Sequence, residues 1–106
     1  MTTLPATIRA LLASSPWNGL LPFAINNGEC EAFQQDIIEA AGLDGREVER
    51  CTSNYDAPGM PGHCWVEVEG RHYDAEAPDG VDDREDLPCF KAWSKQRAER
   101  AAKGGA

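Results

Sequence analysis

The sequence predicts an α+β fold in which a helix with Cys30 near its N-terminal end packs against a small antiparallel β-sheet. Apolar residues recur every three to four positions over residues 26–42, and two alternating runs flank Gly70 within residues 62–76. The length of 106 residues allows one modest core. We therefore expect residues 1–106 to form a single domain, with residues 103–106 as a flexible tail.

The N-terminal region is predicted to be a short helix followed by an irregular segment. Residues 4–14 carry apolar side chains at helical spacing, namely Leu4, Ile8, Leu11 and Leu12. The next stretch, SPWNGLLPFAINNG, is rich in Pro, Gly and Asn, which is typical of a loop. We expect Trp17 and Phe23 to anchor this loop on the core.

Residues 26–42 are predicted to form the helix that carries the first cysteine. The apolar stripe of this helix consists of Cys30, Phe33, Ile37, Ile38 and Ala41. Asn26 or Asn27 is expected to cap the start, and Gly42 is expected to end the helix. Cys30 then lies in the first helical turn.

The middle of the chain is predicted to supply the sheet. Residues 46–51 alternate as a short strand, and residues 52–62 form a turn-rich connector. The alternating runs of residues 62–76 indicate a β-hairpin with a two-residue loop at Glu69 and Gly70.

The register of this hairpin decides which side chains meet. Counting outward from the two-residue loop places His63 opposite Glu76 and Trp65 opposite Asp74. Because side chains alternate between the two faces of a sheet, His63 shares its face with both carboxylates, while Tyr73 takes the other face.

Charge is unevenly distributed along the chain. Eighteen acidic residues against ten basic ones give a net charge of −8, and residues 79–86 form an acidic loop. A helix over residues 87–102 follows, with Phe90 and Trp93 on one face. Surfaces that bind nucleic acid need clustered Lys and Arg, so we expect no nucleic-acid partner.

The chain lacks the signals of membrane insertion and export. No apolar run approaches the roughly 20 residues that a membrane-spanning helix needs. The N-terminal stretch has one arginine and no basic region preceding an apolar one, so it does not resemble a signal peptide. We expect a cytoplasmic protein with no membrane partner.

Cysteine and histidine spacing does not indicate a metal site. The four cysteines, which are Cys30, Cys51, Cys64 and Cys89, show no C-x-x-C pair, and the two histidines are too far apart for an H-x3–5-H pair. In a reducing compartment the thiols are expected to stay free. We therefore expect no metal and no cofactor, and we interpret the last three cysteines as structural thiols.

Cys30, by contrast, has the features of a nucleophile. A thiol at the start of a helix is acidified by the helix dipole and by free amide groups, which also donate to an oxyanion. Catalysis further requires a histidine to exchange the thiol proton and a group that orients the imidazole. His63 supplies the first, and Asp74 or Glu76 the second, if the hairpin packs against the helix.

The stretches NGECEAF and GHCWVEVEGRHYDAEAP together resemble the core of transglutaminase-like and papain-like cysteine enzymes. In that family a cysteine begins a helix, a histidine begins a strand, and an aspartate lies on the next strand. The resemblance covers residues 26–78 and implies Cys30 as nucleophile, His63 as acid–base and Asp74 as orienter. It also implies a papain-like/transglutaminase-like core and an oxyanion donor upstream of Cys30, for which Asn26, Asn27 or Trp17 is the candidate.

Two classes of function follow from these observations. The first is a small cysteine hydrolase or acyltransferase that acts on a protein or peptide substrate through a thioester, with water or an amine as acceptor. The second is a non-enzymatic interaction or inhibitor protein whose acidic surface binds a basic protein partner.

Overall fold

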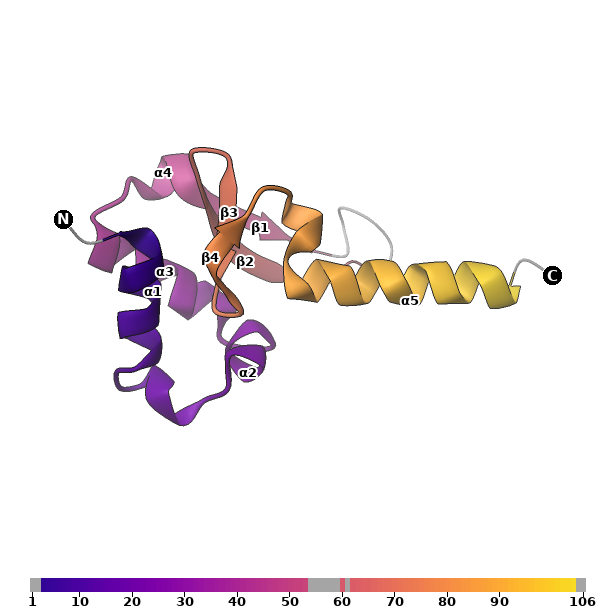
Figure 1. Cartoon of the computed structure of the whole chain (residues 1–106), viewed down its shortest axis with the longest axis horizontal. Helices are drawn as coiled ribbons and strands as arrows, with labels where there is room; N and C mark the ends of the chain where they lie inside the picture. The colour runs from indigo at the N-terminus through magenta and orange to yellow at the C-terminus, as the bar shows by residue number, and fades with distance from the viewer. Residues whose placement is uncertain (1–2, 54–59, 61, 105–106) are drawn as a thin grey trace.

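The structure is a computed structural model that describes residues 3–53, 60 and 62–104, and it shows an α+β fold with helices packed around a four-stranded antiparallel sheet (Figure 1). The helices are α1 (Leu4–Leu12), α2 (Pro22–Asn26), α3 (Cys30–Ala41), α4 (Gly45–Val48) and α5 (Pro88–Gly104), with 3-10 turns η1 (Trp17–Gly19) and η2 (Arg84–Asp86). The strands are β1 (Glu49–Thr52), β2 (His63–Val68), β3 (Arg71–Asp74) and β4 (Ala77–Val81), in the spatial order β1-β2-β3-β4.

The β2–β3 hairpin has the predicted register. Val68 pairs with Arg71, and the loop between them consists of Glu69 and Gly70, with φ of 52° and 81°. Positive φ at both loop positions is the signature of a type I′ turn, whose twist matches that of the flanking strands. The two-residue loop is thus confirmed.

The far end of this hairpin differs from the prediction. β3 ends at Asp74, and the chain turns at Ala75 and Glu76 into β4, so the first three residues of the predicted acidic loop 79–86 belong to a strand. Glu76 therefore does not pair with His63 across the sheet. The cause is the Asp74 side chain, which accepts hydrogen bonds from the main-chain amides of the next residues and so forms a turn.

The segment before α3 also differs from the prediction. Asn26 is the last residue of α2 rather than a cap of α3, and the residue that precedes α3, Glu29, makes no capping hydrogen bond with its side chain. Pro22 favours a separate helix start because its fixed φ suits the first helical turn. Gly42 does end α3, in the left-handed conformation with φ of 65°.

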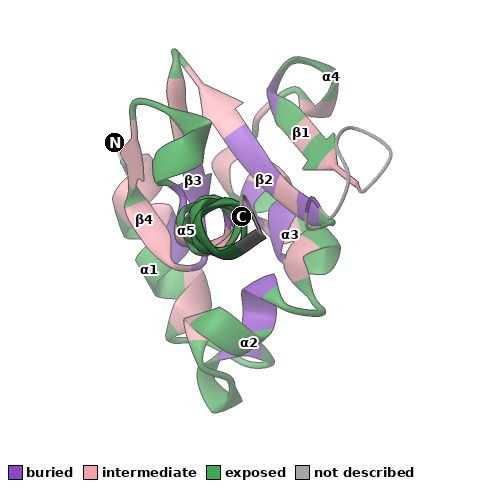
Figure 2. Ribbon diagram, turned by 90° about the vertical axis from the view of Figure 1, so that its right-hand side faces the viewer, coloured by how far each residue is buried: buried purple, intermediate pink, exposed green. Residues whose placement is uncertain are grey.

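The two faces of the sheet carry separate apolar clusters. The α3 side contains Ile8, Trp17, Ile25, Phe33, Ile37, Val48, Val66, Tyr73 and Ala75. The opposite side contains Met60, Trp65, Leu87 and Phe90, contributed in part by the start of α5. Figure 2 shows buried segments in β2 and α3, whereas α5 is exposed along most of its length.

Of the two expected loop anchors, Trp17 is buried and Phe23 is not. The Trp17 ring packs edge-on against Phe33, and its indole N–H donates to Asp36 Oδ2 at 2.8 Å. Phe23 is 65% exposed, because helix α2 turns it away from the core and toward α5. The expectation that Phe23 anchors the loop was therefore wrong.

The C-terminal helix extends away from the body of the molecule (Figure 1). α5 reaches Gly104, so the first two residues of the predicted tail 103–106 are helical, while residues 105–106 lie outside the described part. Most of the predicted connector 52–62 also lies outside it. The predicted strand over residues 46–51 begins at Glu49, since the preceding residues form α4. Within the described ranges, no helix combines the length and apolarity needed to cross a bilayer.

Candidate active site

His63 and Asp74 form a buried hydrogen-bonded pair. His63 Nε2 lies 2.9 Å from Asp74 Oδ2, and their side chains are 0% and 2% exposed. The other carboxylate oxygen, Oδ1, accepts the main-chain N–H groups of Glu76 at 2.9 Å and Ala77 at 2.8 Å. Three donors thus hold the carboxylate in place, and the short side chain of aspartate lets one residue both shape the turn and orient the imidazole.

Aromatic rings enclose the His63 imidazole. The Trp65 ring stacks on it with centroids 5.8 Å apart, and Phe90 at the start of α5 meets it edge-on at the same distance. The indole N–H of Trp65 donates to His72 Nδ1 at 2.9 Å, which fixes the position of this wall. The imidazole therefore has little freedom to rotate away from Asp74.

The second ring nitrogen of His63, Nδ1, is the one that can exchange a proton with a thiol. Among the described side chains it is the buried polar atom that has no hydrogen-bond partner. Because Nε2 is taken by Asp74, Nδ1 is the atom available to the Cys30 thiol. The two side chains influence each other's protonation, but without a hydrogen bond of ordinary geometry, as is common in enzymes before substrate binds.

Cys30 is the first residue of α3 and is half-buried. Its interaction with His63 lowers the pKa of the thiol; burial opposes this change, and the main-chain amide and thiol of Cys64 reinforce it. The amide groups of the first helical turn, which have no intrahelical acceptor, face the same end of the helix. The exposed neighbours Glu29 and Glu31 do not prevent the pKa from falling.

The protonation of His63 changes in the opposite direction. Burial lowers the pKa of His63, but the hydrogen bond and charge of Asp74, together with the Cys30 thiol, outweigh burial and raise it from 6.5 to about 9. A lowered thiol pKa beside a raised imidazole pKa favours transfer of the proton from sulfur to nitrogen. Both changes thus favour the thiolate–imidazolium form of the pair over the neutral form.

Glu76, the alternative orienter of His63, has a different partner. Its Oε1 accepts a hydrogen bond from Asn26 Nδ2 at 2.9 Å. This bond links the end of α2, four residues before Cys30, to the turn that follows Asp74. Sequence reasoning missed the bond because Asn26 and Glu76 are 50 residues apart, and no local pattern relates them.

The candidates for an oxyanion donor upstream of Cys30 are already engaged. The Trp17 indole N–H donates to Asp36, and the side-chain amide of Asn27 donates to the Phe23 carbonyl at 2.8 Å. The side-chain amide of Asn26 donates to Glu76 Oε1. The main-chain amides at the start of α3 are therefore the better placed donors.

A pair of thiols that is separate from the proposed nucleophile lies next to this site. Cys51 and Cys64 are directly opposite each other on β1 and β2, and their sulfurs are 2.8 Å apart. Burial raises the pKa of Cys64, and Cys51 adds to the rise. The alternation of strand residues places Cys64 on the face of α3, beside Cys30 rather than beside the His63 ring.

Within the part of the chain that the structure describes, no three His, Cys, Asp or Glu side chains are grouped as metal ligands would be. The chain matches no family model, no curated protein and no solved structure. The geometry of Cys30, His63 and Asp74 is therefore the main evidence for a function of this chain.

Proposed function

We propose that the protein is a small cysteine hydrolase or acyltransferase that uses Cys30 as its nucleophile. The observation that carries this proposal is the buried 2.9 Å hydrogen bond between His63 Nε2 and Asp74, which leaves Nδ1 free towards a thiol at the start of a helix. A buried, unpartnered nitrogen costs stability, so its presence favours a functional role for that atom.

The proposed reaction uses Cys30, whose pKa is lowered, as the nucleophile and His63, whose pKa is raised, as the proton donor. The Cys30 thiolate attacks the carbonyl carbon of an amide or ester, forming an S–C bond, and the main-chain amides of the first turn of α3 donate to the oxyanion. His63 Nδ1 gives its proton to the leaving amine or alcohol as the C–N or C–O bond breaks. Water or an amine then attacks the thioester carbonyl, and His63 takes up the proton of that acceptor. The C–S bond breaks, which releases the acid or the new amide and returns Cys30 to the thiolate beside the protonated His63.

The site is built so that His63 shuttles the proton in a single orientation. Asp74 accepts from Nε2 in every step, and two main-chain amides hold its other carboxylate oxygen in place. The Trp65 and Phe90 rings pack against the imidazole, which is fully buried and therefore shielded from bulk water. A papain-like or transglutaminase-like arrangement of these elements is part of the proposal.

Site-resolved alkylation tests this function. The protein is treated with iodoacetamide at pH 7, and modification of each cysteine is followed by mass spectrometry. Cys51 is the internal control, because it is exposed whereas Cys30 is half-buried, so access alone favours Cys51. We expect Cys30 to react at least tenfold faster, because thiolate rather than thiol is the nucleophile.

The same measurement on His63→Ala separates activation from access. Removing the imidazole should slow alkylation of Cys30 while leaving Cys51 unchanged. An activated ester such as p-nitrophenyl acetate should also leave an acetyl group on Cys30, detected as a mass increase that Cys30→Ser abolishes. Equal alkylation rates at the two cysteines, unaffected by His63→Ala, would exclude the enzyme and leave the acidic interaction protein as the better hypothesis.

A further inference from the structure

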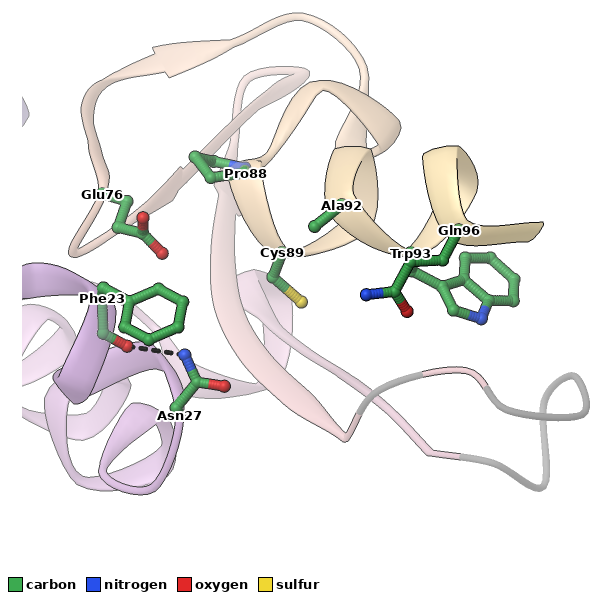
Figure 3. A pocket seen from close by; sticks show the side chains of 8 residues that line it. All are labelled: Phe23, Asn27, Glu76, Pro88, Cys89, Ala92, Trp93 and Gln96. Atoms are coloured by element: carbon green, nitrogen blue, oxygen red, sulfur yellow. Dashed lines mark hydrogen bonds between the residues drawn. The ribbon is translucent and has the colours of Figure 1, made fainter. Parts of the chain in front are cut away.

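A cavity of about 340 Å³ opens beside the candidate active site, between α2, the β3–β4 turn and the first turns of α5 (Figure 3). Its lining includes Phe23 and Asn27 from the α2 side, Glu76 from the turn, and Cys89, Ala92 and Trp93 from α5. Figure 3 shows the carboxylate of Glu76 and the ring of Phe23 on one side, facing the thiol of Cys89.

The cavity adjoins the groups proposed to carry out the reaction. The main-chain N–H of Glu76 donates to Asp74 Oδ1, so one wall follows directly from the turn that holds the carboxylate of the triad. Burial raises the pKa of the Cys89 thiol to about 12, and the charges of Asp74, Cys30 and Glu76 contribute to the rise. Cys89 therefore lies within electrostatic range of both Glu76, the carboxylate of the cavity, and Cys30, the proposed nucleophile.

The lining has the composition of a site for a positively charged group. Glu76 Oε1 is held by Asn26, and its second oxygen accepts no hydrogen bond from the described residues, so a donor can still bind there. Phe23 presents an exposed aromatic ring beside this carboxylate. A carboxylate next to an aromatic face is the combination that recognises ammonium and guanidinium groups.

Two further features favour a cation. None of the eight lining residues is a lysine or arginine, so no side chain of the lining neutralises Glu76. Figure 3 shows Trp93 at the opposite end of the cavity from Phe23 and Glu76. The guanidinium of Arg97 already lies over the Trp93 ring, 4.7 Å from its centroid, which leaves the end at Phe23 and Glu76 for a ligand. The net charge of −8 adds a long-range attraction for cationic molecules.

We propose that this cavity binds the basic side chain of a lysine- or arginine-containing peptide substrate, with Glu76 as its charge partner and Phe23 as its aromatic wall. This inference rests on the proposed function, because it places the basic residue beside the carbonyl that Cys30 attacks. It identifies the substrate class as basic peptides.

Binding of matched peptides tests the proposal without requiring catalysis. In the Cys30→Ser protein, the Kd of acetyl-Ala-Lys-Ala-amide is compared with that of acetyl-Ala-norleucine-Ala-amide by NMR titration. Norleucine has a side chain of similar length without the charge. We expect the lysine peptide to bind about tenfold more tightly, since a charge-assisted hydrogen bond contributes enough free energy for that factor.

Three variants locate the preference. Glu76→Gln keeps an oxygen for the Asn26 hydrogen bond but removes the charge, and should reduce the lysine preference to less than twofold. Glu39→Gln removes the same charge from an exposed position on α3 and should leave the preference unchanged. Phe23→Ala, at a position that is 65% exposed and therefore tolerant of truncation, should weaken binding of the lysine peptide.

Equal affinity for the two peptides, or a lysine preference that survives Glu76→Gln, would overturn this inference. Such a result leaves the fast alkylation of Cys30 untouched, so it does not bear on the proposed chemistry. Conversely, slow alkylation of Cys30 together with Glu76-dependent lysine binding would refute the enzyme and retain the cation site.

Discussion

Replacement of Asp74 by asparagine tests whether the carboxylate sets the protonation of His63. Asparagine retains an oxygen that can accept the amides of Glu76 and Ala77, so the turn is preserved. The atom that meets His63 Nε2, however, becomes an NH₂ group, which donates and carries no charge. The imidazole then loses the partner that stabilises its protonated form and favours the wrong tautomer.

The size of the effect follows from the pKa of His63, which the folded protein raises from 6.5 to about 9. That rise corresponds to about 3 kcal/mol in favour of the imidazolium. Burial acts against the charged form, and Cys30 alone remains to oppose it in Asp74→Asn. We therefore expect the pKa of His63 to fall to 6.5 or below, and alkylation of Cys30 at pH 7 to slow by about tenfold or more.

NMR titration of the His63 Cε1–H signal from pH 5 to 10 measures this change directly. The unmodified protein should titrate near 9 and Asp74→Asn at least two pH units lower. If His63 titrates near 9 in both proteins, Asp74 does not control the imidazole, and the reasoning that places it in the triad is refuted.

The same change predicts how stability depends on pH. Because the folded state raises the pKa of His63, protonation contributes stability that is complete below pH 6.5 and is lost as the pH rises through about 9. This contribution amounts to about 3 kcal/mol. Urea unfolding at pH 6 and pH 9.5 should therefore show a smaller loss of stability in Asp74→Asn than in the unmodified protein, and identical losses would contradict this assignment.

Three other substitutions or treatments test the rest of the structure. Cys51 and Cys64 lie directly opposite each other in the sheet and should form a disulfide on treatment with dithiodipyridine. The disulfide is detected as a mass loss of about two hydrogens, which Cys51→Ser should abolish. A pair of thiols that stays reduced would contradict their proximity. Gly80→Ala should destabilise the fold by more than about 1 kcal/mol in thermal or urea unfolding, because φ is 81° and the new methyl group would lie 2.6 Å from the Tyr73 ring; an unchanged midpoint would refute this packing. Phe33→Ala should cost about 3–5 kcal/mol in urea unfolding, since the ring is 2% exposed in the larger core, and a loss below about 1 kcal/mol would place it outside that core.

Local patterns were sufficient to predict the central hairpin. Glu69 and Gly70 form a two-residue turn, and alternation then assigns Tyr73 to the α3 side and Trp65 to the opposite side. These features depend on residues that are close in sequence and on the pleat of the backbone. The left-handed end of α3 at Gly42 was predictable for the same reason.

Features that depend on distant contacts were not predictable in this way. The expected capping role of Asn26 was wrong, because Asn26 ends α2 and donates to Glu76. The sequence predicts an acidic loop over residues 79–86, whereas residues 79–81 belong to β4, because this strand is stabilised by pairing with β3 and by the close approach of Gly80 to Tyr73. Phe23 was assigned to the core on hydrophobicity alone, although the direction of α2 exposes it.

The amino-acid order alone thus placed a cysteine at a helix start and a histidine at a strand start, with two carboxylates as candidate partners. Folding selected between the carboxylates: Asp74 reaches Nε2 because its short side chain is held by the turn amides, while Glu76, beyond that turn, faces Asn26 and the neighbouring cavity. The physical reason is that strand alternation and helix periodicity are local, whereas the end of a strand and the direction of a side chain beyond it depend on hydrogen bonds between residues distant in sequence.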